Sequence, residues 1–257
     1  MKTSSKQGND TTYYLLQIAG VIALVGLWQF SAERGWIDAT FFGKPSDIYL
    51  FLKNGFFQSK TLWRELGYTL AATGISFVSG SVGAVAAGLL FAALPKLQRA
   101  VDPYLTLFNA MPRIALAPLF LLWFGLGLGS KVAVGFNLTF FIVLSSTTAG
   151  IRGVNADFLT LSRSLGCTPV QIFFKVTLPS AVPVIFSGLR LGLIYAMLGV
   201  VGGELIAAEH GLGQQLAYLQ SNFDTSGVMA ILFLLAVLGL VITTGMTWLE
   251  RRLLHWQ

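Results

Sequence analysis

Long runs of apolar residues, each of about 20 positions, are the feature that most constrains this chain. A run of that length crosses the hydrocarbon core of a bilayer as a helix, because a helix satisfies its backbone polar groups internally. We predict six such spans: residues 13–30, 68–94, 101–125, 131–150, 183–206 and 227–249. The chain is therefore expected to be an all-α membrane protein, with a single transmembrane domain over residues 1–257.

The composition agrees with this fold class and excludes others. Of the 257 residues, 54% are hydrophobic and 11% are charged, whereas a soluble domain carries roughly a quarter charged residues. We assign the net charge of +6 to the cytoplasmic ends of the spans and expect no nucleic-acid partner. The single cysteine, Cys167, and two distant histidines offer no metal-binding spacing, so no metal site is expected.

The placement of lysine and arginine predicts the orientation of the spans. With the N-terminus inside, Arg152, Lys175 and Arg251 fall on the cytoplasmic side, and the outer segment 207–226 has no basic residue. The first outer loop does carry basic residues, so the bias is modest. Six spans with both termini in the cytoplasm fit this pattern best.

The polar segment 154–179 separates the fourth and fifth predicted spans. Asn155 can cap a helix, and Gly166 can end it in the left-handed conformation. Thr168–Pro169 then has the form of an N-cap followed by the first helical position, and Pro179 is expected to stop this second helix. The segment thus predicts a helix–turn–helix on the cytoplasmic side. It could simply lie on lipid, or it could dock another protein through its apolar side.

The spacing inside this segment resembles the EAA loop of permease subunits from ATP-binding-cassette importers. A glycine is followed, after nine intervening residues, by Val-x-Leu-Pro, so that the fixed positions hold Gly166, Val176, Leu178 and Pro179. The Glu-Ala-Ala positions hold Thr160, Leu161 and Ser162. The charged contact that the family glutamate offers to the ATPase is therefore absent or made differently. Arg163 is a candidate replacement charge.

The resemblance extends to the sulfonate, taurine and nitrate branch of these permeases. Residues 110–127 look like the branch's third span, 140–152 like its approach to the loop, and 203–213 like its segment after span five. One departure is Ala72, where the branch often carries arginine. The resemblance implies the transmembrane fold of a type I importer, in the bacterial inner membrane, and a chain that is not itself an enzyme.

The same resemblance implies the partners. These are a second permease copy, two ATPase subunits that hold ATP and Mg²⁺, a periplasmic or lipid-tethered binding protein, and membrane lipid. The sequence agrees, since it has no G-x-x-x-x-G-K-[ST] phosphate loop and so no expected cofactor of its own. The implied cargo is a small organic anion, such as a sulfonate, taurine, nitrate or an aromatic carboxylate. The alternative cargo is a thiamine-precursor pyrimidine or another vitamin.

Two function classes outside this family remain for comparison. A stand-alone secondary transporter or channel would show inverted repeats or paired charges at mid-membrane, and the sequence shows neither. An intramembrane enzyme would need convergent acid, base or metal-binding residues inside the spans, which are also missing from the sequence.

Polar and helix-breaking residues inside the spans are candidates for a translocation path: Asn109, Pro112, Arg113, Pro118 and Asn137. The prolines can open the backbone to a cavity or merely kink the helix. Arg113 can attract an anion, snorkel, or pair with a carboxylate, and each asparagine can equally form an interhelical hydrogen bond. Near the outer end of span five, Glu204 and Glu209 are candidates for an outer gate or for contact with a binding protein.

Overall fold

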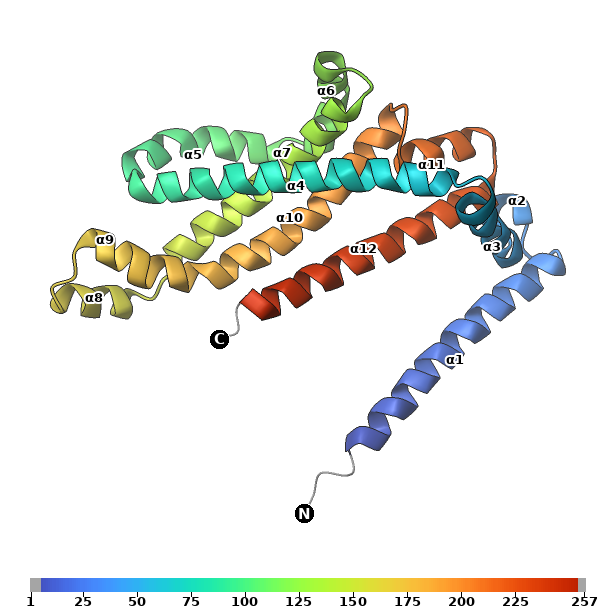
Figure 1. The fold of residues 1–257 in the computed structure, drawn as a ribbon, viewed down its shortest axis with the longest axis horizontal. Coiled ribbons are helices and arrows are strands. Elements are labelled where there is room, and N and C mark those ends of the chain that lie inside the picture. Colours follow the sequence, from blue (N-terminus) through green and yellow to red (C-terminus); the bar gives the residue numbers. More distant parts are fainter. Residues whose placement is uncertain (1–5, 254–257) are drawn as a thin grey trace. The chain divides into compact units, whose positions relative to one another are not determined.

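The computed structural model describes residues 6–253, with side chains from residue 16 onward except that of Ala39, and every regular element in this range is helical (Figure 1). The elements, in chain order, are α1 Lys6–Glu33, α2 Ala39–Phe42, α3 Pro45–Lys53, η1 Asn54–Gln58, α4 Thr61–Ala93, α5 Pro95–Ala110, η2 Arg113–Leu116, α6 Ala117–Phe124, α7 Leu128–Arg152, α8 Ala156–Ser164, α9 Pro169–Ile172, η3 Phe173–Thr177, α10 Leu178–Ile206, α11 Leu212–Ser221 and α12 Thr225–Leu253.

Within the described residues, five helical stretches are long and apolar enough to cross a membrane: Leu16–Glu33, Thr61–Ala93, Leu128–Arg152, Pro169–Ile206 and Thr225–Leu253. A sixth is counted when α5 and the η2–α6 pair are taken as one broken span, bent by 90°. The predicted span 101–125 is therefore not one continuous helix. Met111 is extended because it precedes Pro112, and the bend lies there. Pro118 lies in the first turn of α6, where a proline is tolerated without a bend.

The chain divides into two compact units. The first comprises Met1–Trp63 and Tyr218–Phe233, and the second comprises Arg64–Ala217 and Leu234–Gln257. In the first unit, α3 is attached to α1 through Gln29, whose side-chain oxygen accepts from the backbone N–H of Ser46 at 3.1 Å. Trp28 of α1 also lies beside Phe233 of α12, with ring centroids 6.3 Å apart. A side-chain hydrogen bond and an aromatic contact thus help to join the elements of this unit.

The centre of the second unit is the contact between α7 and α10. Small residues let these two helices approach closely: a Cβ added at Gly188 would lie 2.2 Å from Cβ of Ser146, and one at Gly192 would lie 2.7 Å from a methyl group of Val143. Such contacts let membrane helices associate through van der Waals packing. The hydroxyl of Thr139 adds an interhelical hydrogen bond, donating to the carbonyl of Gly192 at 3.2 Å.

The fifth predicted span differs from the expectation at its start. Pro179 does not stop the second helix of the loop, because α9 continues through the π-helical turn η3 into α10, and Pro169–Ile206 is one helical stretch. The wider π turn forms directly before Pro179, at the place where a proline lacks its own hydrogen bond and crowds the preceding carbonyl. Pro183 likewise lies inside α10 and does not begin it.

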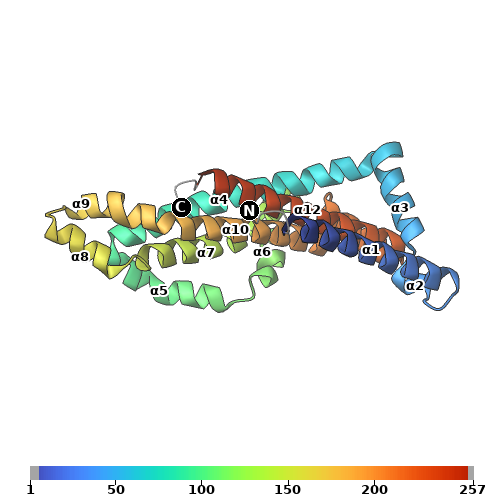
Figure 2. The same cartoon turned by 90° about the horizontal axis from the view of Figure 1, so that it is seen from below.

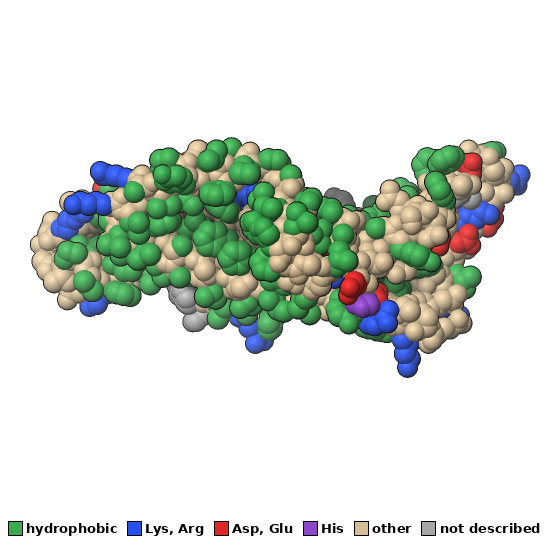
Figure 3. All heavy atoms as spheres, turned by 90° about the horizontal axis from the view of Figure 1, so that it is seen from above, with side chains coloured by type: hydrophobic (Ala, Val, Ile, Leu, Met, Phe, Trp, Pro, Cys, Tyr) green, Lys and Arg blue, Asp and Glu red, His purple; other side chains and the backbone are tan. Residues whose placement is uncertain are grey.

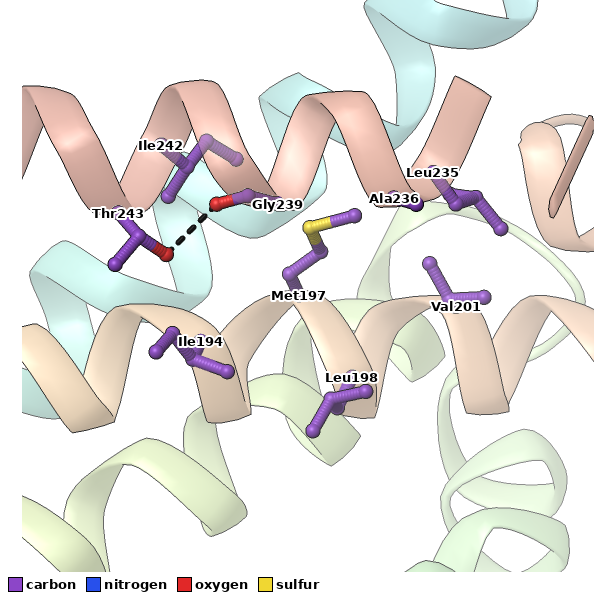
Figure 4. Close-up of a pocket in the computed structure, with 9 residues that line it drawn as sticks. All are labelled: Ile194, Met197, Leu198, Val201, Leu235, Ala236, Gly239, Ile242 and Thr243. Carbon is purple, nitrogen blue, oxygen red and sulfur yellow. Dashed lines mark hydrogen bonds between the residues drawn. The ribbon is translucent and has the colours of Figure 1, made fainter. Parts of the chain in front are cut away.

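The face between α10 and α12 is apolar. A groove of about 390 Å³ lies there, lined among others by Ile194, Met197 and Leu198 of α10 and by Leu235, Ile242 and Thr243 of α12 (Figure 4). The Thr243 hydroxyl donates to the carbonyl of Gly239 at 2.7 Å, so its proton is already used (Figure 4). Hydrophobic side chains are also spread widely over the face drawn in Figure 3. These surfaces suit a lipid environment.

Candidate functional site

The segment 154–179 folds as a helical hairpin, in which α8 and α9 lie beside one another (Figures 1 and 2). The predicted cap at Asn155 is confirmed, since its side chain accepts from the N–H of Asp157 at 2.8 Å. Gly166 ends α8 with φ +76°, as predicted. Its N–H donates to Arg163 and that of Cys167 donates to Ser162, which is the Schellman arrangement. The turn of the hairpin is therefore fixed by backbone geometry.

The second helix of the hairpin begins at the predicted cap. Thr168 and Gln171 form a reciprocal capping box, with Pro169 in the first turn. Because this helix continues into α10, the hairpin and the longest apolar stretch of the chain are one piece. The remaining signature residues, Val176, Leu178 and Pro179, lie on this continuous part and are half-buried or exposed.

The hairpin exposes apolar side chains on both of its helices, and we call this set the hairpin face. It consists of Phe158, Leu161, Leu165, Val170 and Phe174, whose side chains are between 55% and 72% exposed. Thr160, at the position of the family glutamate, is exposed, and its hydroxyl donates to the carbonyl of Ala156 at 2.9 Å. Ser162 is buried and donates to Phe158 in the same way. The hydroxyl protons of Thr160 and Ser162 are thus used within α8, and large apolar side chains are exposed beside its polar ones.

Arg163 lies at the edge of a hollow between the hairpin and the ends of α4 and α7. This hollow, of about 480 Å³, is also lined by Ile151, Leu159, Cys167 and Phe173. Arg163 is exposed, and its charge is therefore available to a partner at this surface. It lies one helical turn from Thr160 and Leu159, on the helix that carries the signature.

At the other end of α7 and α10, which we call the far end, Glu204 is completely enclosed, with 1% of its surface exposed. Its carboxylate lies 3.7 Å from the ammonium group of Lys131, a side chain that is also buried. The carboxylate accepts from the Thr69 hydroxyl and from the backbone N–H of Gly213, each at 2.9 Å. A buried charge requires such partners, so Glu204 acts inside the fold and its side chain does not reach the surface.

A second carboxylate completes this far-end cluster. Glu65 of α4 accepts from the N–H of Gly211 at 2.7 Å and lies 3.6 Å from Nδ1 of His210. The His210 ring stacks on Tyr68 with centroids 4.6 Å apart, and its carbonyl accepts from Lys131. The cluster therefore joins α4, α7 and α10 to the turn before α11. Glu209, in the same turn, is exposed.

Sequence reasoning identified Glu204 but missed Lys131, Thr69 and Glu65. Thr69 is 135 residues from Glu204 in the chain, and no local pattern links them. One signal was present: a lysine at the beginning of an apolar span is expensive to bury without an acidic partner, so Lys131 implied one.

The bend after α5 joins two of the predicted path residues. Arg113 donates to the side-chain oxygen of Asn109, and its guanidinium carbon lies 4.6 Å from the ring centroid of Phe141. Arg113 therefore pairs with an amide and an aromatic ring. Pro112 and Pro118 are exposed on either side of it. The Asn137 side-chain oxygen is buried, and no partner for it lies among the described residues.

Residues 80–255 match the family model described as the inner membrane component of binding-protein-dependent transport systems. The chain belongs to this family. The permease is 32% identical over 257 residues to the formylaminopyrimidine transport permease protein of Halalkalibacterium halodurans, which covers 100% of this chain and 99% of the relative. It is 29% identical over 246 residues to the taurine transport system permease protein of Escherichia coli K12, covering 94% and 89% of the two chains.

The structural comparison gives the same fold. An inward-facing structure of the MetNI methionine ABC transporter superposes with a TM-score of 0.65 and 25% identity, covering 75% of the permease and 95% of that chain. The predicted family, the type I importer fold and the multi-pass location in the inner membrane are confirmed. The permease is a subunit of an ABC importer and not itself a catalytic enzyme, and its family implies ATPase and substrate-binding partners.

Proposed function

We propose that two copies of the permease form the translocation path of an importer for a small organic anion, and that the hairpin 154–179 couples this path to two ATPase subunits. The observation that carries the proposal is the hairpin face, with five apolar side chains exposed on a segment that also carries exposed polar and charged residues. Fully burying one such side chain is worth about 1.5–3 kcal/mol. A partner that covers the face therefore gains substantial binding energy.

The geometry favours docking through apolar fit. Thr160 offers no carboxylate, and its hydroxyl proton is used within α8. Shape and apolar area then supply most of the contact, with Arg163 as the nearby charge. ATP and Mg²⁺ belong to the partner subunits in this proposal, because the chain has no phosphate-binding loop.

The continuity of the hairpin with α10 supplies the route for coupling. Pro169–Ile206 spans 38 residues, or roughly 57 Å at about 1.5 Å per residue. A displacement of the hairpin by a closing ATPase pair moves this helix as a lever. Its other end carries Glu204, so the movement reaches the far-end cluster. We propose that this cluster maintains the outer closure and that the exposed Glu209 contacts the binding protein.

We propose an anionic cargo because of the positive charge of Arg113. Arg113 is the basic side chain at the broken span, beside Asn109 and Phe141, and it attracts an anion there. The similarity to a formylaminopyrimidine permease over the whole chain supports the alternative cargo, a thiamine-precursor pyrimidine. Phe141 and Asn109 could stack with and hydrogen-bond such a ring.

The docking role is tested by removing the hairpin face. The double variant Leu161→Asn and Leu165→Asn replaces two exposed leucines and leaves the N-cap residue Asn155 and the turn residue Gly166 unchanged. When the genes of the permease and its ATPase are co-expressed, this variant is expected to capture less than a tenth of the ATPase that the wild type captures from solubilised membranes. Phe223→Asn is the control, since Phe223 is 85% exposed and lies outside the hairpin. Equal capture by the double variant and the control would reject the docking role.

A further inference from the structure

A polar groove of about 140 Å³ lies between α5 and α7, in the half of α7 nearer the hairpin. From α5 it is lined by polar side chains spaced about one turn apart: Gln98, Asp102, Thr106 and Asn109. Thr148 and Arg152 are among the residues that line it from α7. Polar side chains at this spacing form a stripe along one side of a helix. Such a stripe in a membrane helix faces water, cargo or protein rather than lipid.

An ion pair crosses the groove at the hairpin end. The guanidinium of Arg152 lies 3.5 Å from the carboxylate of Asp102, and the two side chains are 63% and 47% exposed. A water-exposed pair of this kind is weak, so it opens and closes at little cost. Toward the bend, Asn109 has its oxygen engaged by Arg113, which leaves the amide hydrogens of Asn109 as donors. The groove thus has hydrogen-bond donors toward the bend and a separable ion pair at its exit.

We infer that this groove is the last binding station for the cargo before release, and that the Asp102–Arg152 pair is its inner gate. The inference rests on the proposed function, since it assumes that the chain conducts a solute. The fitting ligand is a small solute with one anionic group, a carboxylate or a sulfonate. In this inference the anionic group moves from Arg113 to Arg152, where it takes the place of the Asp102 carboxylate as ion-pair partner. The cargo is released when Asp102 pairs with Arg152 again.

The chemistry of the lining supports an anion over a cation. Asp102 is the acidic side chain of the groove, and Arg152 already neutralises it, while Arg113 adds a second guanidinium at the bend. Asn109 lies seven residues from Asp102 along α5, so the two ends of the groove are roughly 10 Å apart by the rise of a helix. A small anion can therefore pass from Arg113, which contacts the lining residues Asn109 and Phe141, along the groove to Arg152.

The test uses a thiol in the groove. In a Cys167→Ser background, Thr106→Cys places one cysteine one turn from Asp102. The permease–ATPase complex is reconstituted in liposomes with its hairpin side outward, and labelling by a membrane-impermeant maleimide is timed. Arg152→Gln and Asp102→Asn are each expected to open the gate and to speed labelling about tenfold. The charge exchange Asp102→Arg with Arg152→Asp is expected to restore the slow rate to within about twofold.

The same assay identifies the class of ligand, because a ligand bound in the groove protects the cysteine from labelling. Sodium benzoate is expected to slow the labelling at least threefold, whereas its neutral isostere benzamide is expected to have no effect. In the Arg152→Gln variant, benzoate should no longer slow the labelling. Equal protection by both probes would show that the groove does not select for the anionic group, and this would overturn the inference.

The failure of the gate and the failure of the proposed function give different results. Unchanged labelling in both single variants, within a complex that still contains the ATPase, overturns the gate alone. Absence of the ATPase from the wild-type complex overturns the proposed function. Size-exclusion profiles identify any variant that has lost its fold. The charge-exchange variant is then an independent test, because fast labelling of Thr106→Cys in that variant would also contradict the inference.

Discussion

Single residues at the far end show how a membrane helix bundle carries a buried charge. Lys131 is enclosed, yet its ammonium group reaches both the carboxylate of Glu204 and the carbonyl of His210. The carboxylate in turn accepts two further hydrogen bonds, from Thr69 and Gly213. Each of these charges is paired and hydrogen-bonded. Loss of one partner therefore leaves the other as an unpaired charge in a low-dielectric interior.

We therefore expect Lys131→Met to lower the free energy of unfolding by on the order of 3 kcal/mol, because it strands the Glu204 carboxylate. Thermal unfolding of the solubilised protein measures this. Arg64→Met is the matched control: Arg64 also pairs with a far-end carboxylate, that of Glu65, but its side chain is 61% exposed, so the loss should be below about 1 kcal/mol. Adding Glu204→Gln to Lys131→Met should recover part of the stability. Equal shifts for Lys131→Met and Arg64→Met would contradict a paired buried charge.

At the scale of elements, the contact between α7 and α10 depends on glycine. Gly188 and Gly192 are four residues apart and so lie on the same side of α10, and the side chains of Ser146 and Val143 on α7 pack directly against them. The Cβ of Ser146 is fixed by its own backbone, so it cannot move aside for an added methyl group unless the helices separate. The glycines thus set the distance between the two helices.

The same substitution should have opposite effects at two glycines. At Gly188, alanine would place a Cβ 2.2 Å from that of Ser146, and we expect a loss of about 1–3 kcal/mol through overpacking. At Gly245 of α12, the space around an added Cβ is open, and alanine should stabilise the helix by up to about 1 kcal/mol. Thermal unfolding in one detergent compares the two variants. A gain at Gly188 would show that the helices are not held this closely.

The elements also show what a sequence of this kind predicts. Bilayer thickness determines the length of the apolar runs, and local hydrogen bonding determines the caps at Asn155 and Thr168, so both could be predicted from the sequence. The continuation of α9 into α10 could not, because a proline normally ends a helix and the π turn that accommodates Pro179 has no simple pattern. The far-end cluster was also hidden, since Lys131 and Glu204 meet only after the chain folds.

For the whole molecule, α5 is the element against which we expect the proposed second copy to pack. Every residue of α5 is exposed or half-buried, although its sequence is polar on one side and it lies beside membrane-spanning helices. Lipid is an unfavourable environment for Asp102, Thr106 and Asn109. Two copies related by a twofold axis would turn their polar grooves toward each other and enclose one aqueous path.

This arrangement predicts a specific cross-link. Thr106→Cys, in a Cys167→Ser background, should be joined to its counterpart by a short bismaleimide in native membranes, and most of the chain should migrate as a dimer on a denaturing gel. Leu240→Cys is the control, because Leu240 is an apolar residue that is 67% exposed on α12 and does not belong to the polar groove of α5. This variant should remain monomeric. Dimers at position 240 without dimers at 106 would place the interface on α12. In that case the groove of each copy would face lipid or a different partner, and an enclosed path lined by α5 could not form.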